Sequence, residues 1–155
     1  AKGVVANMAK APKGNDRYQV KAVANGIGSI AIANTYYIGK MVDNKDKSQR
    51  DAVKKVKILF PTFQNGGTHI NISGAGVAKY APNKANAIKF IEFLASKDAQ
   101  KLFAEGNYEY PVLAGVESSK LVSSWGEFKD DTISINTLGE NNKAAVKIFD
   151  KAGWK

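Results

Sequence analysis

The sequence predicts an α/β fold, and three observations support that class. First, residues 17–42 alternate between an amphipathic helix over 17–25, four apolar residues over 30–33, and a second helix that opens with Tyr36. Second, apolar residues recur at spacings of three and four over 84–105, which is the period of an α-helix. Third, the apolar run over 30–33 does not alternate with polar residues, as is typical of a strand covered on both faces.

The boundaries of the elements follow from capping residues and glycines. Asn15 or Asp16 begins the first of these helices and Gly26 ends it, while Ser96 divides the long helical stretch into two. The sequence further predicts helices over 1–11, 117–123 and from about 138–142 to 153, strands over 56–60, 68–72 and up to 79, an extended piece over 132–135, and a mainly exposed loop over 43–55.

Composition limits the possible functions. The 155 residues include no cysteine and one histidine, His69, which excludes thiolate metal sites and a multi-histidine site within the chain. The net charge is +9, but lysines are spread along the chain and only two arginines occur, so we expect no nucleic-acid partner. No run of 18 apolar residues is present, which predicts a protein that is not embedded in a membrane.

No constellation of residues supports an enzyme. The glycine pairs Gly26/Gly28 and Gly74/Gly76 do not extend to a nucleotide-binding motif, and Ser73 is not in a nucleophile-elbow sequence. His69 alternates with apolar neighbours in a predicted strand, which indicates a half-exposed structural residue. We therefore expect a binding protein rather than a catalyst.

The pair Tyr36-Tyr37 is the candidate metal site. At a helix N-terminus both phenol oxygens can reach the space beyond the helix end, where unpaired N–H groups and the helix dipole favour negative charge. Two phenolates would offer hard, anionic oxygen donors of the kind that suits a ferric ion. The alternative from the residues alone is one core ring and one surface ring. Two tyrosines cannot fill the shell of such a cation, so other ligands would have to come from outside this segment.

Several blocks of the chain resemble one protein family: IAIANTYYIGK, FPTFQNGGTHINISGAGVAKYAPN, ANAIKFIEFLASKDAQKLFAEGNYEYPV and SWGEFKDD. Together, from Ala11 to Trp154, they resemble the ferric-iron-binding periplasmic proteins of bacterial ABC importers. The resemblance implies a two-lobed, type II periplasmic binding protein that captures Fe(3+), with or without a synergistic anion such as carbonate, and delivers it to an inner-membrane ABC permease. It also implies that Tyr36 and Tyr37 are signature iron ligands.

Family members are about twice as long, and the chain resembles only their C-terminal half. The resemblance then implies that residues 1–57 belong to the tyrosine-bearing lobe, 58–113 to the other lobe, and 114–155 to the tyrosine-bearing lobe again. We expect an N-terminal fragment of the same protein as a partner, because parts of two lobes alone would leave strand edges and apolar faces uncovered. The alternative function is a binding protein of the same fold for an oxyanion or other small solute, held at the helix terminus of Thr35 and Tyr36.

Overall fold

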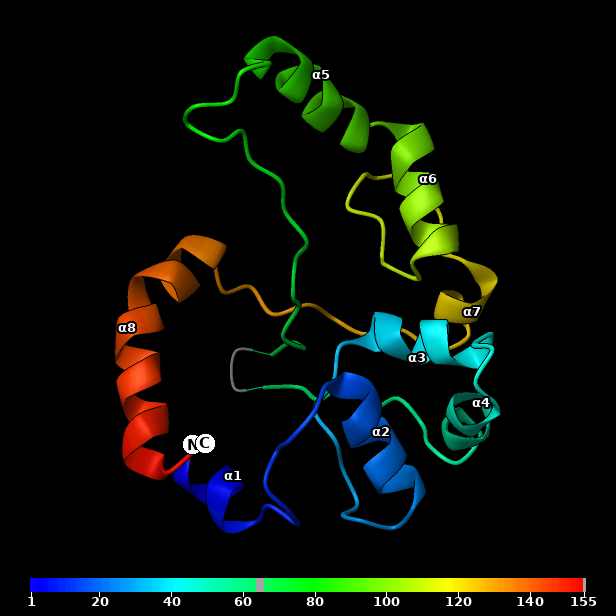
Figure 1. Cartoon of the computed structure of the whole chain (residues 1–155), viewed down its shortest axis with the longest axis vertical. Coiled ribbons are helices and arrows are strands. Elements are labelled where there is room, and N and C mark those ends of the chain that lie inside the picture. Colours follow the sequence, from blue (N-terminus) through cyan, green and yellow to red (C-terminus); the bar gives the residue numbers. More distant parts are fainter. Residues whose placement is uncertain (64–65, 155) are drawn as a thin grey trace. The chain divides into compact units, whose positions relative to one another are not determined.

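The computed structural model describes residues 1–63 and 66–154, and within these ranges the regular structure is helical (Figure 1). The helices, in chain order, are α1 (Lys2–Ala6), α2 (Asp16–Ala24), α3 (Thr35–Val42), α4 (Lys47–Val53), α5 (Lys84–Leu94), α6 (Lys97–Gly106), α7 (Lys120–Ser123) and α8 (Ile135–Ala152). Helices α1 and α7 are shorter than the helices predicted over 1–11 and 117–123. Helix α8 is longer than predicted, because it begins at Ile135 instead of at about 138–142.

The chain forms two compact units, each assembled from separate stretches of sequence. Unit 1 comprises Ala1–Ala33, Asn44–Ile70 and Phe128–Lys155, and unit 2 comprises Asn34–Asp43 and Asn71–Glu127. Helix α3 therefore shares a unit with α5, α6 and α7, although its neighbours in sequence belong to the other unit.

The predicted lobe segments, 1–57, 58–113 and 114–155, do not share boundaries with these units. They refer to the lobes of a protein longer than this chain. The lobe assignment therefore stays a prediction.

In unit 1, α2 packs against α4, and both helices carry buried residues. The Asn15 side chain caps α2 by accepting a hydrogen bond from the Tyr18 backbone N–H at 3.4 Å, which agrees with the predicted start of that helix. Val20 and Ala22 of α2 and Ala52 of α4 are buried there. These small side chains allow two short helices to approach closely.

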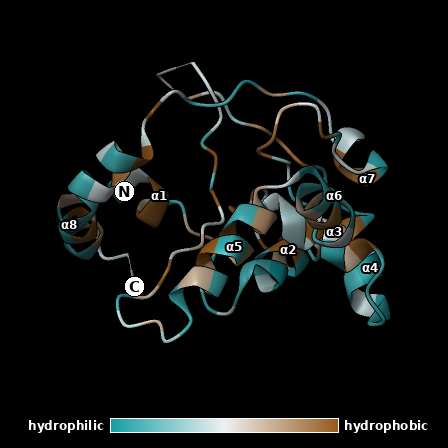
Figure 2. Ribbon diagram, turned by 90° about the horizontal axis from the view of Figure 1, so that it is seen from above, coloured by the Kyte–Doolittle hydropathy of each residue, from teal (hydrophilic) through white to brown (hydrophobic). Residues whose placement is uncertain are grey.

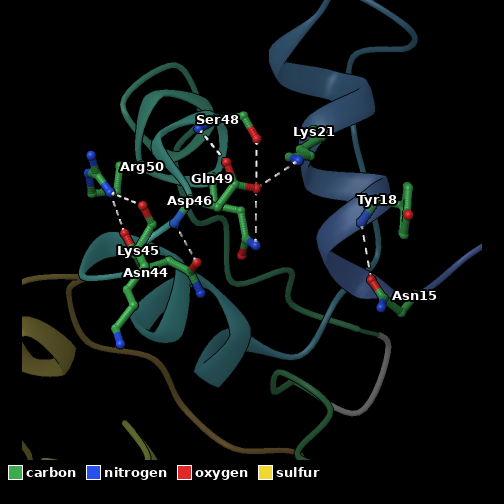
Figure 3. A network of polar contacts seen from close by, with 9 residues as sticks. All are labelled: Asn15, Tyr18, Lys21, Asn44, Lys45, Asp46, Ser48, Gln49 and Arg50. Carbon is green, nitrogen blue, oxygen red and sulfur yellow. Dashed lines mark hydrogen bonds and ion pairs between the residues drawn. The ribbon is translucent and has the colours of Figure 1, made fainter.

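Helix α4 corrects the prediction of a mainly exposed loop over 43–55. Its N-cap is Asp46, whose carboxylate accepts hydrogen bonds from the Ser48 backbone N–H and hydroxyl, both at 2.9 Å (Figure 3). Lys21 of α2 lies 3.6 Å from the same carboxylate. The sequence of α4 is mostly polar, and Ala52 is its buried residue. It therefore lacks the apolar stripe by which a helix is recognised in a sequence.

The predicted strands are not formed within residues 1–63 and 66–154. They were expected over 30–33, 56–60, 68–72 and up to 79. A strand needs a paired backbone, and the one bridge found in the described residues is an isolated parallel bridge between Thr68 and Asp130. Ile30 and Ile32 are each 78% exposed, so this apolar run lies uncovered. The predicted extended piece at 132–135 leads directly into α8.

The bridge brings two distant parts of unit 1 into close contact. The Thr68 N–H donates to the Lys129 carbonyl at 2.7 Å, and the Asp131 N–H donates to the Thr68 carbonyl at 2.8 Å. The backbone of Asp130 and Asp131 lies directly against Gly67, where no Cβ would fit. Glycine is required here because two backbones approach each other.

In unit 2 the long helical stretch divides as predicted. The Ser96 hydroxyl caps α6 by accepting from the Ala99 backbone N–H at 3.3 Å. The buried Gln100 amide donates to the Leu94 carbonyl at the end of α5 and accepts from the Val112 N–H, both at 2.9 Å. The apolar residues buried in this unit are Met41, Ala99, Ala104 and Val122.

Helix α8 belongs to unit 1 and buries none of its residues. It begins at Ile135, where the Ser134 hydroxyl accepts from the Thr137 N–H at 3.1 Å, and it ends at Gly153 in the left-handed conformation. Hydrophobic residues nevertheless occur on this helix and along the linking segments (Figure 2), and the larger ones on α8 are more than one-third exposed.

Candidate metal centre

Helix α3 carries the two predicted ligands in its first turn. Asn34 has an extended backbone, with φ −75° and ψ 136°, and the helix follows from Thr35. The sequence predicted a helix that opens with Tyr36, and the helix begins one residue earlier. Tyr36 and Tyr37 are therefore the second and third residues of the helix, next to the end at which backbone N–H groups lack helical acceptors.

The rings of Tyr36 and Tyr37 lie side by side. Their centroids are 4.1 Å apart and the ring planes are inclined by 31°. Both residues are partly exposed, so the alternative of one core ring and one surface ring does not describe the pair. The structure thus brings two phenol groups together on one part of unit 2.

The electrostatics of the helix start favour negative charge. The Asn34 side chain does not cap α3, because its oxygen accepts a hydrogen bond from the Asn71 amide at 3.0 Å. The ammonium of Lys40 lies 5.3 Å from the centre of the Tyr36 ring, within the range of a cation–π contact. The helix dipole and this cation both stabilise a negatively charged group at the tyrosines.

Acidic and imidazole side chains of the described residues do not form a second candidate metal site. In the part of the chain that the structure describes, no three His, Cys, Asp or Glu side chains gather closely enough to hold a metal ion. His69 is exposed, somewhat more so than the predicted half-exposed residue. The pair supplies two oxygen donors, whereas a ferric ion takes about six.

Two other tyrosines of unit 2 have protons that are held more firmly. The Tyr108 hydroxyl donates a hydrogen bond to the Asp43 carboxylate at 2.9 Å, and that bond, with burial, raises the pKa of Tyr108. Burial raises the pKa of Tyr110. A higher pKa disfavours the phenolate form, so neither residue is as suited to bind a cation as an exposed tyrosine.

Sequence reasoning did not identify the contacts that hold α3 in place. The side chain of Tyr108 lies against Gly39 of α3, and the amide of Asn71 binds Asn34. One signal was present in the sequence: Gly39 lies inside the predicted helix, where glycine is unfavourable and often marks a close approach by another group.

None of the helices in the described ranges is long and apolar enough to cross a membrane.

Comparison with solved structures defines the class as the type II periplasmic binding proteins, the fold class that the sequence predicted. Apo ferric ion-binding protein A from Pasteurella haemolytica superposes with a TM-score of 0.92 at 47% identity, over 99% of this chain and 47% of that chain. The Trichodesmium protein IdiA (FutA), in complex with iron and citrate ligands, superposes with a TM-score of 0.90 at 49% identity, over 99% of this chain and 49% of that chain.

The chain belongs to the family of bacterial extracellular solute-binding proteins, whose model matches residues 6–130. Iron uptake protein A1 from Synechocystis is 50% identical over 155 residues, which is all of this chain and 43% of that protein. The chain thus spans less than half the length of the curated relatives it matches.

Proposed function

We propose that this chain is the C-terminal half of a periplasmic solute-binding protein that captures ferric iron and delivers it to an ABC permease. The observation that carries the proposal is the Tyr36-Tyr37 pair at the start of α3, with ring centroids 4.1 Å apart. Relatives named for iron uptake and for ferric iron binding, at identities up to 50%, support the choice of cargo.

Tyr36 and Tyr37 would bind the cargo as phenolates. The ordinary pKa of tyrosine is about 10, but a trivalent cation strips the proton from a ligand that coordinates it. The start of α3, with its positive dipole end, lies at the pair, and the Lys40 ammonium lies 5.3 Å from the centre of the Tyr36 ring. Ferrous iron, with a lower charge, would be held less strongly.

The other donors come from outside α3. We place them in the part of the complete protein that precedes this chain and in a synergistic anion such as carbonate. The start of α3 suits an anion, since the Asn34 side chain binds Asn71 instead of capping the helix. Binding would then close the protein around the ion, and opening, proton uptake or reduction would release it.

The partner segment would also cover apolar surface. Ile30, Ile32 and Leu59 are each more than 70% exposed and lie in segments without regular secondary structure. In the complete protein we assign these segments to a sheet whose remaining strands precede this chain. The gene product is then either one longer polypeptide or two associated fragments. Iron uptake by a purified 16.7 kDa species alone, measured by intact mass and metal content, would contradict this assignment.

Ferric loading of the complete protein tests the function. Bound phenolates should produce a visible ligand-to-metal charge-transfer band. The variants Tyr36→Phe and Tyr37→Phe should each weaken that band and the affinity for ferric iron, and the double variant should abolish the band. Tyr80→Phe is the matched control, because Tyr80 is 85% exposed in the same unit.

A second candidate is an oxyanion-binding protein of the same fold. The start of α3 favours this candidate, because the Asn34 side chain does not cap the helix and an anion can bind at a helix N-terminus. Saturable phosphate or sulfate binding without iron, together with no charge-transfer band on addition of ferric iron, would support this candidate over ferric iron.

A further inference from the structure

Tyr108 has an unusual backbone conformation. Its φ is 58°, and it is the non-glycine residue with positive φ among those the structure describes. It directly follows Asn107, the C-cap of α6, whose N–H donates to the Phe103 carbonyl at 3.0 Å. Helices commonly place glycine at this position, since a side chain is strained there. A tyrosine held in this conformation therefore needs compensating contacts.

One compensating contact is with the middle of α3. Gly39 is buried, and a Cβ added there would lie 2.6 Å from Cδ2 of Tyr108 and nearer still to Cγ and Cβ. No side chain fits between the two residues. Glycine inside α3 lowers its helix propensity, and the close approach of Tyr108 explains why glycine is present.

The second contact is with the end of α3. The Tyr108 hydroxyl donates to Oδ2 of Asp43 at 2.9 Å, and Asp43 is the C-cap of the helix. Tyr108 thus contacts α3 at two points, Gly39 and Asp43, one helical turn apart. Gly39 follows Tyr36 by three residues and so lies on the same side of the helix.

Two points of contact fix both the rotation of a short helix about its axis and its position along that axis. The eight residues of α3 are too few to hold their place without tertiary contacts. A rotation of α3 would redirect the phenol oxygens of Tyr36 and Tyr37, which lie in its first turn.

We infer that Tyr108 is a positioning residue, which sets the direction of Tyr36 and Tyr37 by holding α3 at Gly39 and Asp43. It is not itself a metal ligand, because its hydroxyl proton is donated to Asp43. The inference rests on the proposed function for its link to iron, whereas the placement of α3 can be tested without iron.

The main test is Gly39→Ala in the complete protein, with the ferric charge-transfer band and the affinity for iron in competition with citrate as readouts. Residues that support metal ligands typically change affinity by about 10- to 100-fold when replaced, and we expect a loss in that range with a shifted or weakened band. Gly139→Ala is the matched control, because Gly139 lies within α8 and a Cβ there meets nothing within 4 Å. It should leave band and affinity unchanged.

The bond to Asp43 is tested by a conservative pair. Asp43→Ala removes the acceptor and should weaken the affinity, whereas Asp43→Asn retains an acceptor oxygen and should restore most of it. Tyr108→Phe, which keeps the ring against Gly39 but removes the hydroxyl, should resemble Asp43→Ala. Parental bands and affinities in all three of Gly39→Ala, Asp43→Ala and Tyr108→Phe would overturn the inference.

Crystal structures of the iron-free protein separate this inference from the proposed function. In the Gly39→Ala variant, or in Asp43→Ala if the former does not fold, α3 should be displaced from Tyr108 and the Tyr36 and Tyr37 rings redirected. An unmoved α3 would overturn the inference whether or not the parent takes up iron. A parent with no charge-transfer band would overturn only the proposed function.

Discussion

The two units differ in charge far more than in secondary structure. Unit 1 contains sixteen lysine and arginine residues against seven aspartate and glutamate residues, a net charge of +9, whereas unit 2 contains seven of each and is neutral. The whole net charge of the chain therefore belongs to unit 1. The tyrosine pair lies in unit 2, whose own charged side chains balance.

The units also differ in their cores. The largest fully buried side chains, Met41 and Val122, both belong to unit 2, whereas unit 1 buries smaller residues between α2 and α4 and none on α8. Unit 2 therefore holds its tyrosine-bearing helix in a more complete core. Unit 1 leaves more of its apolar surface for other parts of a longer protein to cover.

Truncation of a buried side chain should give the largest difference between the units in the free energy of unfolding. Met41→Ala removes a fully buried side chain and should lower the free energy of unfolding by about 2–5 kcal/mol. Val20→Ala in unit 1 removes two methyl groups and should cost roughly 1–2 kcal/mol. Urea unfolding of the complete protein measures both, and hydrogen exchange locates the change. Equal losses would show that the two cores are equally well packed.

Removal of helix caps should have a smaller effect that stays within one unit. Ser96→Ala deletes the hydroxyl that accepts from the Ala99 N–H and should cost about 1 kcal/mol. Asn15→Ala deletes the corresponding cap of α2 in unit 1. Hydrogen exchange should show faster opening of α6 for the first variant and of α2 for the second. Faster exchange in both units after either substitution would contradict the prediction that each effect stays within one unit.

At alkaline pH, the loss of folding stability should come from Tyr108 in unit 2. The hydrogen bond to Asp43 raises the pKa of Tyr108 in the folded protein, so the folded state binds this proton more tightly than the unfolded state. The resulting stability is complete below the unfolded pKa of about 10 and is lost as pH rises through the folded pKa. Tyr108→Phe should remove this loss from the curve of unfolding free energy against pH. An unchanged alkaline slope would mean that the bond contributes no stability.

At acidic pH, the loss of folding stability should come from Asp46 in unit 1. It should be the smallest of these effects. Hydrogen bonds from Ser48 lower the pKa of the exposed Asp46 carboxyl, and Lys21 contributes further. Its stabilisation is present above the unfolded pKa of about 3.9 and is lost as pH falls through the lower, folded value. Asp46→Asn keeps a capping oxygen without the charge and should flatten this acid loss, measured by thermal unfolding between about pH 2 and 5. A steeper acid loss in this variant would contradict the assignment.

The helices that were predicted correctly are those whose signals are local. Ser96 marks the break between α5 and α6 because its hydroxyl bonds to a residue three positions later, and Asn15 marks the start of α2 in the same way. Helix α4 was missed since its stability depends on Asp46 and on packing of Ala52 against α2, and neither produces an apolar stripe.

The features that could not be predicted depend on residues far apart in sequence. Apolar runs such as 30–33 indicate strands only if another backbone pairs with them, and the described residues supply no such partner. The tyrosine pair was visible because its two residues are adjacent. The contact of Tyr108 with Asp43 spans 65 residues, and nothing local to Tyr108 indicates its positive φ. The candidate pair was thus visible in the sequence, whereas the contacts that hold its helix were not.

The bridge between Thr68 and Asp130 has a consequence for the order of folding. During synthesis every residue of unit 2, the last being Glu127, emerges from the ribosome before Asp130 does. Unit 2 can therefore fold while unit 1 still lacks its third segment. The chain closes unit 1 across an already ordered insertion, which shortens the effective loop and reduces the entropy lost on closure. Helices α2 and α4 leave the ribosome before Tyr108 does, so they can pack against each other before α3 gains its contacts with Tyr108.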